Sequence, residues 1–242
     1  MTDHYEDVYK NKAVQYELMV SREDYQDNIR TSIQEVRNLT GLDVVDSGAG
    51  TGRLACMFAP FTRSMAAFDT SAAMLEVASQ RLQASGLTNW RTEVADHRQL
   101  PVADASVDVI LSGWSVVYTV VWNKDGTWRD ELGRALAEMR RVLRPGGTMI
   151  ILETMGTGSE SPNPPTDLLE YFEYLKADGF SSNWFRTDYE FASMEEAREL
   201  IPFFFGEEMI EKVQARGEVD PSFDEEESVI LPECTGMWWK QI

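Results

Sequence analysis

The chain has 242 residues, of which 41 are acidic and 22 are basic, so its formal net charge at pH 7 is −19. A surface this acidic repels phosphate backbones, which argues against nucleic acid as a partner. The 43% hydrophobic and 26% charged residues form an ordinary globular balance, and the length suits one α/β domain.

Cysteine usage and hydropathy narrow the setting further. Cys56 and Cys234 are the only cysteines, too few for a disulfide framework or a four-cysteine zinc site, which favours a reducing, cytoplasmic compartment. No cluster of histidines, cysteines and carboxylates has the spacing of metal ligands, so no metal is expected. No apolar run approaches the roughly 20 residues that span a bilayer. We therefore expect a soluble monomer or homodimer with no membrane partner.

The first 40 residues are expected to be helical. Ser21 precedes Arg-Glu-Asp and is interpreted as the N-cap of a helix that runs to about Leu39 and ends at Gly41. From residue 42 onward, short apolar runs alternate with helical periodicity. Strands are expected at 42–46, 64–68, 90–94, 107–111 and 148–152, and helices at 54–61, 71–84 and 128–143. This alternation predicts a parallel, doubly wound, Rossmann-like sheet.

The remaining residues change character after a Gly/Ser/Pro loop at 156–165. A helix is expected at 166–176, a strand at 184–191 and one or two helices at 193–215. The final strand is expected at 227–231 or at 235–239.

A glycine-rich turn follows the first of these strands. Residues 44–53 read VVDSGAGTGR, and this stretch leaves a strand and opens a helix. A dinucleotide site requires G-x-G-x-x-G, but Arg53 stands where the third glycine should be. Asp46 would repel a pyrophosphate and suits a cationic amino group better. The turn therefore favours the amino-acid end of S-adenosylmethionine over a dinucleotide.

Four motifs in order over residues 42–154 resemble the class I S-adenosylmethionine-dependent methyltransferases, in their small-molecule (type 11) branch. The motifs are DSGAGTG at 46–52, AFDTSAAML at 67–75, AD at 95–96 with LP at 100–101 and DASVDVI at 104–110, and RVLRPGG at 141–147. The resemblance implies a seven-stranded sheet of order 3-2-1-4-5-7-6, with the last strand antiparallel and a helical cap at the N-terminus. It also implies one domain over 1–242, with the cap at 1–40, the cofactor-binding core at 42–154, and a substrate-side lid with the last strands at 155–242.

The matching motifs assign one residue to each expected contact with the cofactor. Asp69 would accept from both ribose hydroxyls, and Met74 would pack on the adenine. Asp96 would accept from the adenine amino group, beside a ring-nitrogen contact from the His97 backbone. The alternatives left open are a helix-terminal charge for Asp69, core packing for Met74 and a turn position for Asp96. The full set expected to bind S-adenosylmethionine is Asp46, Gly48, Ala49, Gly50, Gly52, Asp69, Thr70, Met74, Asp96, His97 and Ser112.

The small-molecule acceptor is expected above the carboxyl ends of the fourth and fifth strands. Related sequences often carry a histidine after the fourth strand, where this chain has SVVY at 115–118. Tyr118 and Glu153 are therefore the candidates for positioning or deprotonating the acceptor, with ring packing and a strand-end charge as their alternatives. Aromatic residues fit an apolar or cationic acceptor, although core packing explains them too. The residues expected to bind the acceptor are Tyr9, Tyr25, Trp114, Tyr118 and Trp184.

The expected activity is transfer of a methyl group to the oxygen or nitrogen of a small molecule by in-line displacement, with proximity and alignment as the main catalytic effects. Three alternatives remain: a dinucleotide-dependent oxidoreductase, a non-catalytic S-adenosylmethionine-binding scaffold or regulatory subunit, and an enzyme that transfers another group from the same cofactor. The acidity of the surface is consistent with a cationic substrate, but solubility or a high-salt habitat explains it better.

Overall fold

The central strands are buried along most of their length because helices cover both faces of the sheet. The computed structural model describes residues 2–123, 126–215 and 228–242. The strands of its main sheet are β1 (Asp43–Ser47), β2 (Ser64–Asp69), β3 (Trp90–Val94), β4 (Val107–Gly113), β5 (Leu143–Thr157), β6 (Ser181–Arg186) and β10 (Glu233–Gln241). Within the described residues these seven strands lie in the order β3-β2-β1-β4-β5-β10-β6.

The order of the strands confirms the Rossmann-like sheet, since β6 and β10 are the sixth and seventh of these strands along the chain. Strands β1 to β5 run parallel, whereas β10 is antiparallel to both β5 and β6. Because β10 runs in the opposite direction, its first residue, Glu233, lies beside Thr157 at the end of β5. The start of β10 therefore reaches the same edge of the sheet as the ends of the parallel strands.

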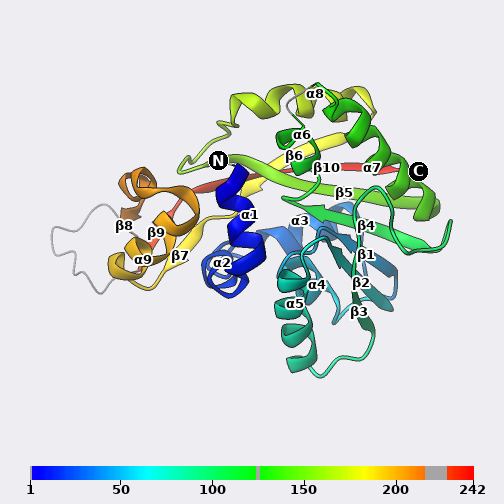
Figure 1. Ribbon diagram of the computed structural model, residues 1–242, viewed down its shortest axis with the longest axis horizontal. Helices are drawn as coiled ribbons and strands as arrows, with labels where there is room; N and C mark the ends of the chain where they lie inside the picture. The colour runs from blue at the N-terminus through cyan, green and yellow to red at the C-terminus, as the bar shows by residue number, and fades with distance from the viewer. Residues whose placement is uncertain (1, 124–125, 216–227) are drawn as a thin grey trace.

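Helices pack on both faces of this sheet, as Figure 1 shows. The helices of the two layers are α3 (Asn28–Val36), α4 (Arg53–Phe58), α5 (Ala72–Ala84), α6 (Tyr118–Val121), α7 (Trp128–Val142) and α8 (Leu169–Ala177). One core joins α7 and α8 to the sheet through Leu132, Leu136 and Tyr171. The core on the other face contains Ile29 and Phe58, from α3 and α4. Both cores exclude water from the faces of the sheet, and the loops of the site extend from the ends of its strands.

A smaller lobe lies beside the main sheet (Figure 1). Its elements are α1 (Thr2–Asn11), α2 (Ala13–Val20), β7 (Tyr189–Phe191), α9 (Met194–Phe205), η2 (Glu207–Lys212), β8 (Gln214–Ala215) and β9 (Val229–Leu231). The short helix η1 (Thr166–Leu168) instead leads into α8, and its Leu168 belongs to the core of the main sheet. In the described part of the chain, β7, β9 and β8 form a three-stranded sheet. Met19, Phe191 and Ile201 belong to a separate core that joins α2 to this sheet and to α9. The N-terminal helices are thus tied to residues about 180 positions away in the sequence.

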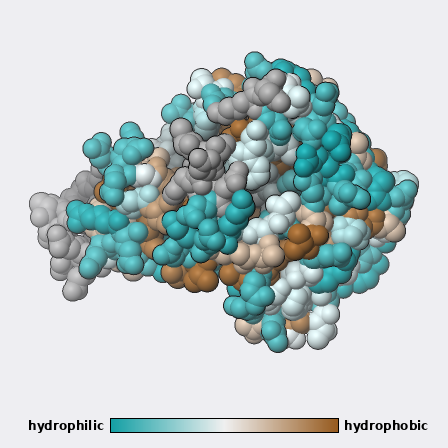
Figure 2. Space-filling view, viewed as in Figure 1, coloured by the Kyte–Doolittle hydropathy of each residue, from teal (hydrophilic) through white to brown (hydrophobic). Residues whose placement is uncertain are grey.

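Hydrophilic residues cover most of the face seen in Figure 2, in keeping with a chain that is 26% charged. Over residues 2–123, 126–215 and 228–242, no helix is long and apolar enough to cross a membrane.

The helix predicted from Ser21 to Leu39 is wrong at its start. Ser21 ends α2 instead, and its hydroxyl donates to the Leu18 carbonyl. The chain then turns through Asp24, whose φ is 64°, before α3 begins at Asn28. The Asp24 carboxylate accepts from the backbone N–H groups of Asn28 at 2.8 Å and Ile29 at 3.0 Å. A capping side chain is therefore present, three residues later than the sequence indicated.

The single strand predicted at 184–191 is also wrong, because β6 and β7 belong to different sheets. The chain leaves the main sheet at Thr187, whose hydroxyl is hydrogen-bonded to that of Thr235 at 2.6 Å. Asp188 then accepts from the backbone N–H of Glu233 at 3.0 Å. Strands form in both segments that were expected to hold the last strand: β9 in the first and β10 in the second.

Replacing Asp24 with alanine is expected to destabilise the protein by about 2 kcal/mol more than Asp27→Ala, as measured by urea unfolding. Both residues have a positive φ, 64° and 60°, so both variants incur the same backbone strain. Only Asp24 caps two N–H groups of α3 with its side chain. Equal destabilisation by the two variants would contradict the capping role.

Candidate active site

A cavity of about 1000 Å³ opens at the carboxyl ends of the parallel strands. The loops after β1, β2, β4 and β5 form one side of it, and α1, α2, α9 and the start of β10 form the other. This edge of an open α/β sheet is where ligands generally bind. The volume is at the upper end of the range for a small-molecule pocket, which leaves room for more than one ligand.

The turn after β1 is packed so closely that it accepts only glycine at residue 48. Gly48 has φ +77°, and a Cβ added there would lie 1.5 Å from the Ser115 Oγ. His97 lies between the turn and the β4 loop, with Nδ1 2.7 Å from the Ser47 Oγ and Nε2 3.0 Å from the Ser115 Oγ. Burial lowers the pKa of His97 to about 4, so its ring is neutral at pH 7 and donates from one nitrogen while accepting at the other. The imidazole therefore fixes two loops of the cavity relative to each other.

Two carboxylates lie at the ends of β1 and β2. Asp46 accepts from the Ala55 N–H at 3.0 Å through Oδ2, while its Oδ1 is buried without a hydrogen bond to any described residue. Burial, opposed by the Ala55 hydrogen bond and reinforced by the charge of Asp69, raises the pKa of Asp46 to about 7. Asp69 accepts from the Gly50 N–H at 2.9 Å and the Ser71 N–H at 2.8 Å. This end of the cavity is therefore rich in hydrogen-bond acceptors.

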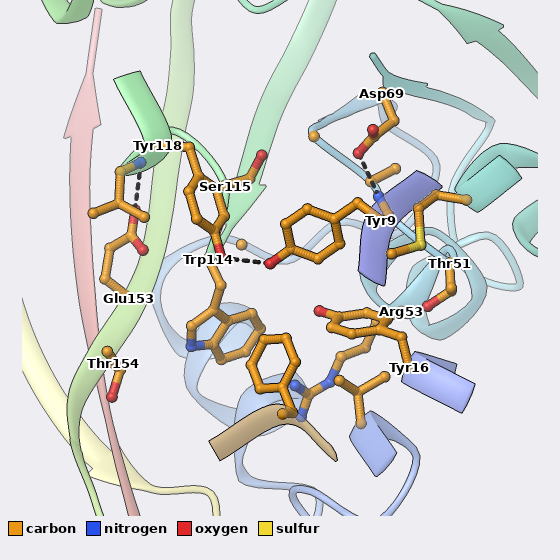
Figure 3. Close-up of a pocket in the computed structure, with 18 of the residues that line it drawn as sticks. Tyr9, Tyr16, Thr51, Arg53, Asp69, Trp114, Ser115, Tyr118, Glu153 and Thr154 are labelled. Carbon is orange, nitrogen blue, oxygen red and sulfur yellow. Dashed lines mark hydrogen bonds between the residues drawn. The ribbon is translucent and has the colours of Figure 1, made fainter. Parts of the chain in front are cut away.

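A pair of tyrosines crosses the middle of the cavity. Figure 3 shows the hydroxyls of Tyr9, from α1, and Tyr118, from α6, joined by a hydrogen bond between the Asp69 side and the Glu153 side. The Tyr9 carbonyl also accepts from the Ser71 hydroxyl at 2.6 Å, which ties α1 to the start of α5. The pair therefore separates one end of the cavity from the other.

Glu153 lies on β5 with 1% of its surface exposed. Its Oε1 accepts from the Tyr171 hydroxyl at 3.0 Å and from the Val117 N–H at 3.2 Å. Burial raises the pKa of Glu153 to about 8, although these hydrogen bonds oppose the shift. A carboxyl group that titrates close to neutral pH is suited to accept or supply a proton.

A second group of charged residues lines the cavity and was not expected from the sequence as a site. Arg53 Nη1 and the Tyr189 hydroxyl both donate to Glu23 Oε2, at 2.6 Å and 2.8 Å. The Arg53 guanidinium lies 4.6 Å from the ring centre of Trp114, a residue held at φ 47°. Figure 3 shows Arg53 below the Trp114 ring. The one signal in the sequence was the charge of Arg53 where a dinucleotide site has glycine.

Glu233 completes this group from the first position of β10. Its Oε1 accepts from the Thr154 hydroxyl at 2.7 Å, and 2% of its surface is exposed. Burial, together with the negative charge of Glu23, raises the pKa of Glu233 to about 8. No sequence motif marks Glu233, because the antiparallel pairing of β10 with β5 alone brings it to this edge.

Most of the residues expected to bind ligands line the cavity. They are Tyr9, Asp46, Gly48, Ala49, Gly50, Asp69, Thr70, Met74, Asp96, His97, Trp114, Tyr118 and Glu153. Both carboxylate oxygens of Asp96 accept from the Arg98 side chain, at 2.7 Å and 2.6 Å, so an adenine amino group would have to share them. His97 contributes a buried side chain in addition to the backbone contact that the sequence suggested.

Four expected site residues do not reach the cavity wall. Gly52 packs against α5, where an added Cβ would lie 2.9 Å from the Ala78 Cβ, and Ser112 is buried within β4. Tyr25 lies in the turn before α3, and its hydroxyl accepts from Gln26. Trp184 is 42% exposed on β6, beyond β10 at the edge of the sheet. Trp184 lies three strands from β4, with β5 and β10 between them, so it does not lie beside the β4 loop. Among the described residues, no group of three or more histidines, cysteines and carboxylates is arranged to hold a metal.

Comparison with known sequences identifies the central part of the chain. Residues 45–151 match the family model described as "Methyltransferase domain". The chain is 36% identical over 122 residues to the malonyl-[acyl-carrier protein] O-methyltransferase of Pectobacterium atrosepticum, covering 50% of this chain and 42% of that protein. It is 35% identical over 113 residues to the ubiquinone/menaquinone biosynthesis C-methyltransferase UbiE of Rubrivivax gelatinosus, covering 47% of this chain and 39% of the relative. The chain thus spans less than half the length of these relatives.

The fold has a similar counterpart among solved structures. The crystal structure of a SAM dependent methyltransferase from Aquifex aeolicus superposes with a TM-score of 0.53 over 87% of each chain, at 16% sequence identity. At this identity the likeness concerns the fold, and it extends beyond the stretch that matches in sequence.

Gly48→Ala is expected to destabilise the protein by about 2 kcal/mol more than Gly50→Ala, because the new methyl group would displace Ser115. Gly50 provides the matched control: its φ is +53°, yet a Cβ there would meet nothing within 4 Å. Urea unfolding of the two variants separates the steric conflict from the shared cost of a positive φ. If the two variants lost equal amounts of stability, Ser115 and His97 would have to move aside without cost, which would contradict the prediction.

Glu153→Gln is expected to flatten the dependence of stability on pH. A carboxyl whose pKa is raised on folding, here from 4.5 to about 8, adds stability below its unfolded pKa and loses it as the pH rises through its folded pKa. Wild-type protein should therefore lose more unfolding free energy than the variant between pH 4.5 and pH 8, by at least about 1.4 kcal/mol, the equivalent of one pKa unit. Glu173→Gln, an exposed control on α8, should behave as wild type. Parallel curves for wild type and Glu153→Gln would refute the assignment.

Proposed function

We propose that this chain is a class I S-adenosylmethionine-dependent methyltransferase, as the family match over residues 45–151 supports, and that it transfers a methyl group from S-adenosylmethionine to an oxygen or nitrogen of a small molecule. The observation that carries this proposal is the arrangement of Asp46 and Asp69 at neighbouring strand ends around a glycine turn.

The cavity residues fit the amino-acid end of this cofactor. Asp46 lines the cavity, and its buried Oδ1 has no hydrogen bond to any described residue. An ammonium group there would supply the missing donor and would lower the pKa of Asp46 from about 7. Gly50 leaves open space where another residue would place a side chain. The turn therefore leaves room for the amino-acid part of the cofactor to bind close to the backbone.

The nucleoside end fits the neighbouring strand. Each Asp69 oxygen already accepts one backbone N–H and keeps a further lone pair, so the two ribose hydroxyls can donate to both oxygens. Met74 is buried at the start of α5 and lines the cavity, consistent with packing against adenine and equally with core packing. Asp96 lies beyond Met74. Its carboxylate can accept a hydrogen bond from adenine, but it already accepts one from Arg98.

The cofactor supplies an electrophilic methyl group on a sulfonium, so the protein's task is to align an acceptor and exclude water. Trp114 and Tyr118 follow β4 and line the passage between the two ends of the cavity. Glu153 holds a proton at neutral pH and can, once ionised, take the proton that an O–H or N–H acceptor loses. The Tyr118 hydroxyl, bonded to Tyr9, is positioned to orient that acceptor.

The alternatives are less consistent with the cavity. A dinucleotide would place its pyrophosphate against Asp46 and Asp69, and Arg53 already donates to Glu23. The relatives named above methylate either oxygen or carbon, by their descriptions. We favour oxygen or nitrogen because Glu153 and Tyr118 suit an acceptor that gives up a proton from a polar atom.

We further propose a cytoplasmic protein that acts on a small molecule and not on nucleic acid. Cys56 and Cys234 are both free thiols, which supports a reducing compartment. The net charge of −19 opposes binding to phosphate backbones.

Calorimetric titration with S-adenosylhomocysteine is expected to give micromolar binding, while NAD gives none. Asp69→Ala should weaken binding at least tenfold, about 1.4 kcal/mol, because it removes both ribose acceptors. Asp104→Ala is the matched control, since Asp104 is exposed and lies outside the cavity wall. Tight binding of NAD, or no binding of S-adenosylhomocysteine to ligand-free folded protein, would overturn the proposed function.

A further inference from the structure

The cavity extends well past the residues that fit the cofactor. The cofactor side lies at β2 and β1, whereas Glu153 and Thr154 lie on β5, and Glu233 lies on β10. In the sheet order β2-β1-β4-β5-β10, β2 and β10 are four strand spacings apart, about 19 Å. The end at β5 and β10 therefore has its own wall, distinct from the Asp69 end.

Three buried polar atoms near the start of β10 have no hydrogen-bond partner among the residues that the structure describes. They are Glu23 Oε1, Arg53 Nη2 and Glu233 Oε2. Only Glu233 is on β10, while Glu23 precedes α3 and Arg53 begins α4. The other atoms of the same groups are engaged, because Glu23 Oε2 binds Arg53 and Tyr189, and Glu233 Oε1 binds Thr154. Leaving three such atoms unsatisfied would cost several kcal/mol, so native proteins rarely bury them without a ligand or water.

The charge balance of these three groups becomes negative when Glu233 ionises. Arg53 neutralises Glu23 through their 2.6 Å ion pair, and no described cation pairs with Glu233. The negative charge of Glu23 raises the pKa of Glu233 and the positive charge of Arg53 lowers it, which places the three groups within electrostatic reach of one another.

Tyr189 and Cys234 also lie near Glu233, and burial keeps both uncharged at neutral pH. Asp188, which accepts from the Glu233 N–H, is neutralised by its ion pair with Arg186. A cation bound beside Glu233 would stabilise the ionised form of its carboxyl group.

We propose that Glu23, Arg53 and Glu233 form the polar end of the acceptor site, and that the acceptor is an aromatic or apolar molecule carrying a protonated amine. The ammonium donates to Glu23 Oε1 and Glu233 Oε2, while Arg53 holds Glu23 in place and offers Nη2 to an oxygen of the same molecule. This inference rests on the proposed function, because it takes the remaining end of the cavity as the cofactor's.

Aromatic rings beside the charged wall fit this class of acceptor. Tyr16, Trp114 and Phe204 line the same cavity, and Tyr16 meets Phe204 edge to face with ring centres 5.4 Å apart. Figure 3 shows Tyr16 and Trp114 on either side of the Arg53 side chain. Rings bind apolar groups by burial and ammonium groups through their electron-rich faces. An uncharged acceptor would use the rings but would not stabilise the ionised form of Glu233.

Benzylamine and benzyl alcohol provide a matched pair of probes that differ in the charged group. Each would be titrated into wild-type protein saturated with S-adenosylhomocysteine. Benzylamine should bind at least about tenfold more tightly than benzyl alcohol. Because Glu233, with a pKa of about 8, is largely protonated at pH 7, ammonium binding should also release protons. Titrations in two buffers of different ionisation enthalpy measure that release.

Glu233→Gln should reduce the preference for the amine to less than about threefold and abolish the proton release. Gln keeps the shape of the side chain and can still accept from the Thr154 hydroxyl. Glu173→Gln, exposed on α8, makes the same chemical change outside the cavity and should leave both readouts unchanged. Both variants must retain S-adenosylhomocysteine affinity, since Glu233 lies at the other end of the cavity. The wild-type comparison stands even if Glu233→Gln does not fold.

Equal binding of the two probes, or no benzylamine binding at about 10 mM, would overturn the inference. So would a Glu233→Gln protein that keeps the full preference. Each of these results, obtained with S-adenosylhomocysteine bound, leaves the proposed methyltransferase function standing. Failure of S-adenosylhomocysteine to bind at all would instead remove the proposed function and this inference together.

Discussion

The close approach of three loops at Gly48 is the constraint on which the cavity depends. Ser115 occupies the place of a Cβ at this residue, and His97 joins Ser47 to Ser115 through both ring nitrogens. The glycine turn, the β4 loop and the segment after β3 are therefore held as one unit. Asp46 and Asp69 flank this unit on the strands, so the position of each carboxylate follows from it. A neutral imidazole serves this purpose because it can donate and accept at once.

The parts of the fold predicted correctly from the sequence are those with local signals. Apolar runs of strand length, and the glycines after β1, identify the parallel strands and the Asp46 and Asp69 end of the site. The failures have long-range causes. The start of α3 depends on Asp24, whose backbone N–H donates to Thr187 and Asp188 in a distant segment. The local sequence around Tyr25 and Trp184 does not indicate whether these residues reach the cavity. Glu233 reaches it because β10 pairs antiparallel with β5, and no sequence motif predicts that pairing.

Electrostatics divides the cavity into parts with different tasks. Asp46, Glu153 and Glu233 each have a pKa raised to between about 7 and 8 by burial, whereas Glu23 lies in an ion pair with Arg53. The chain therefore carries buried acids whose charge responds to what occupies the space beside them. The surface acidity of the whole molecule reinforces this, because a net charge of −19 attracts cations toward the opening.

The reversed direction of β10 has a consequence for biosynthesis. Glu233 is hydrogen-bonded to Thr154, 79 residues earlier in the sequence, and Glu23 to Tyr189, 166 residues later. Contacts of such large sequence separation form slowly, since loop closure must precede them. On the ribosome, the parallel core can assemble while the last strand is still being synthesised. Glu233 would therefore join the cavity only after the parallel strands that carry Asp46 and Asp69 have been synthesised.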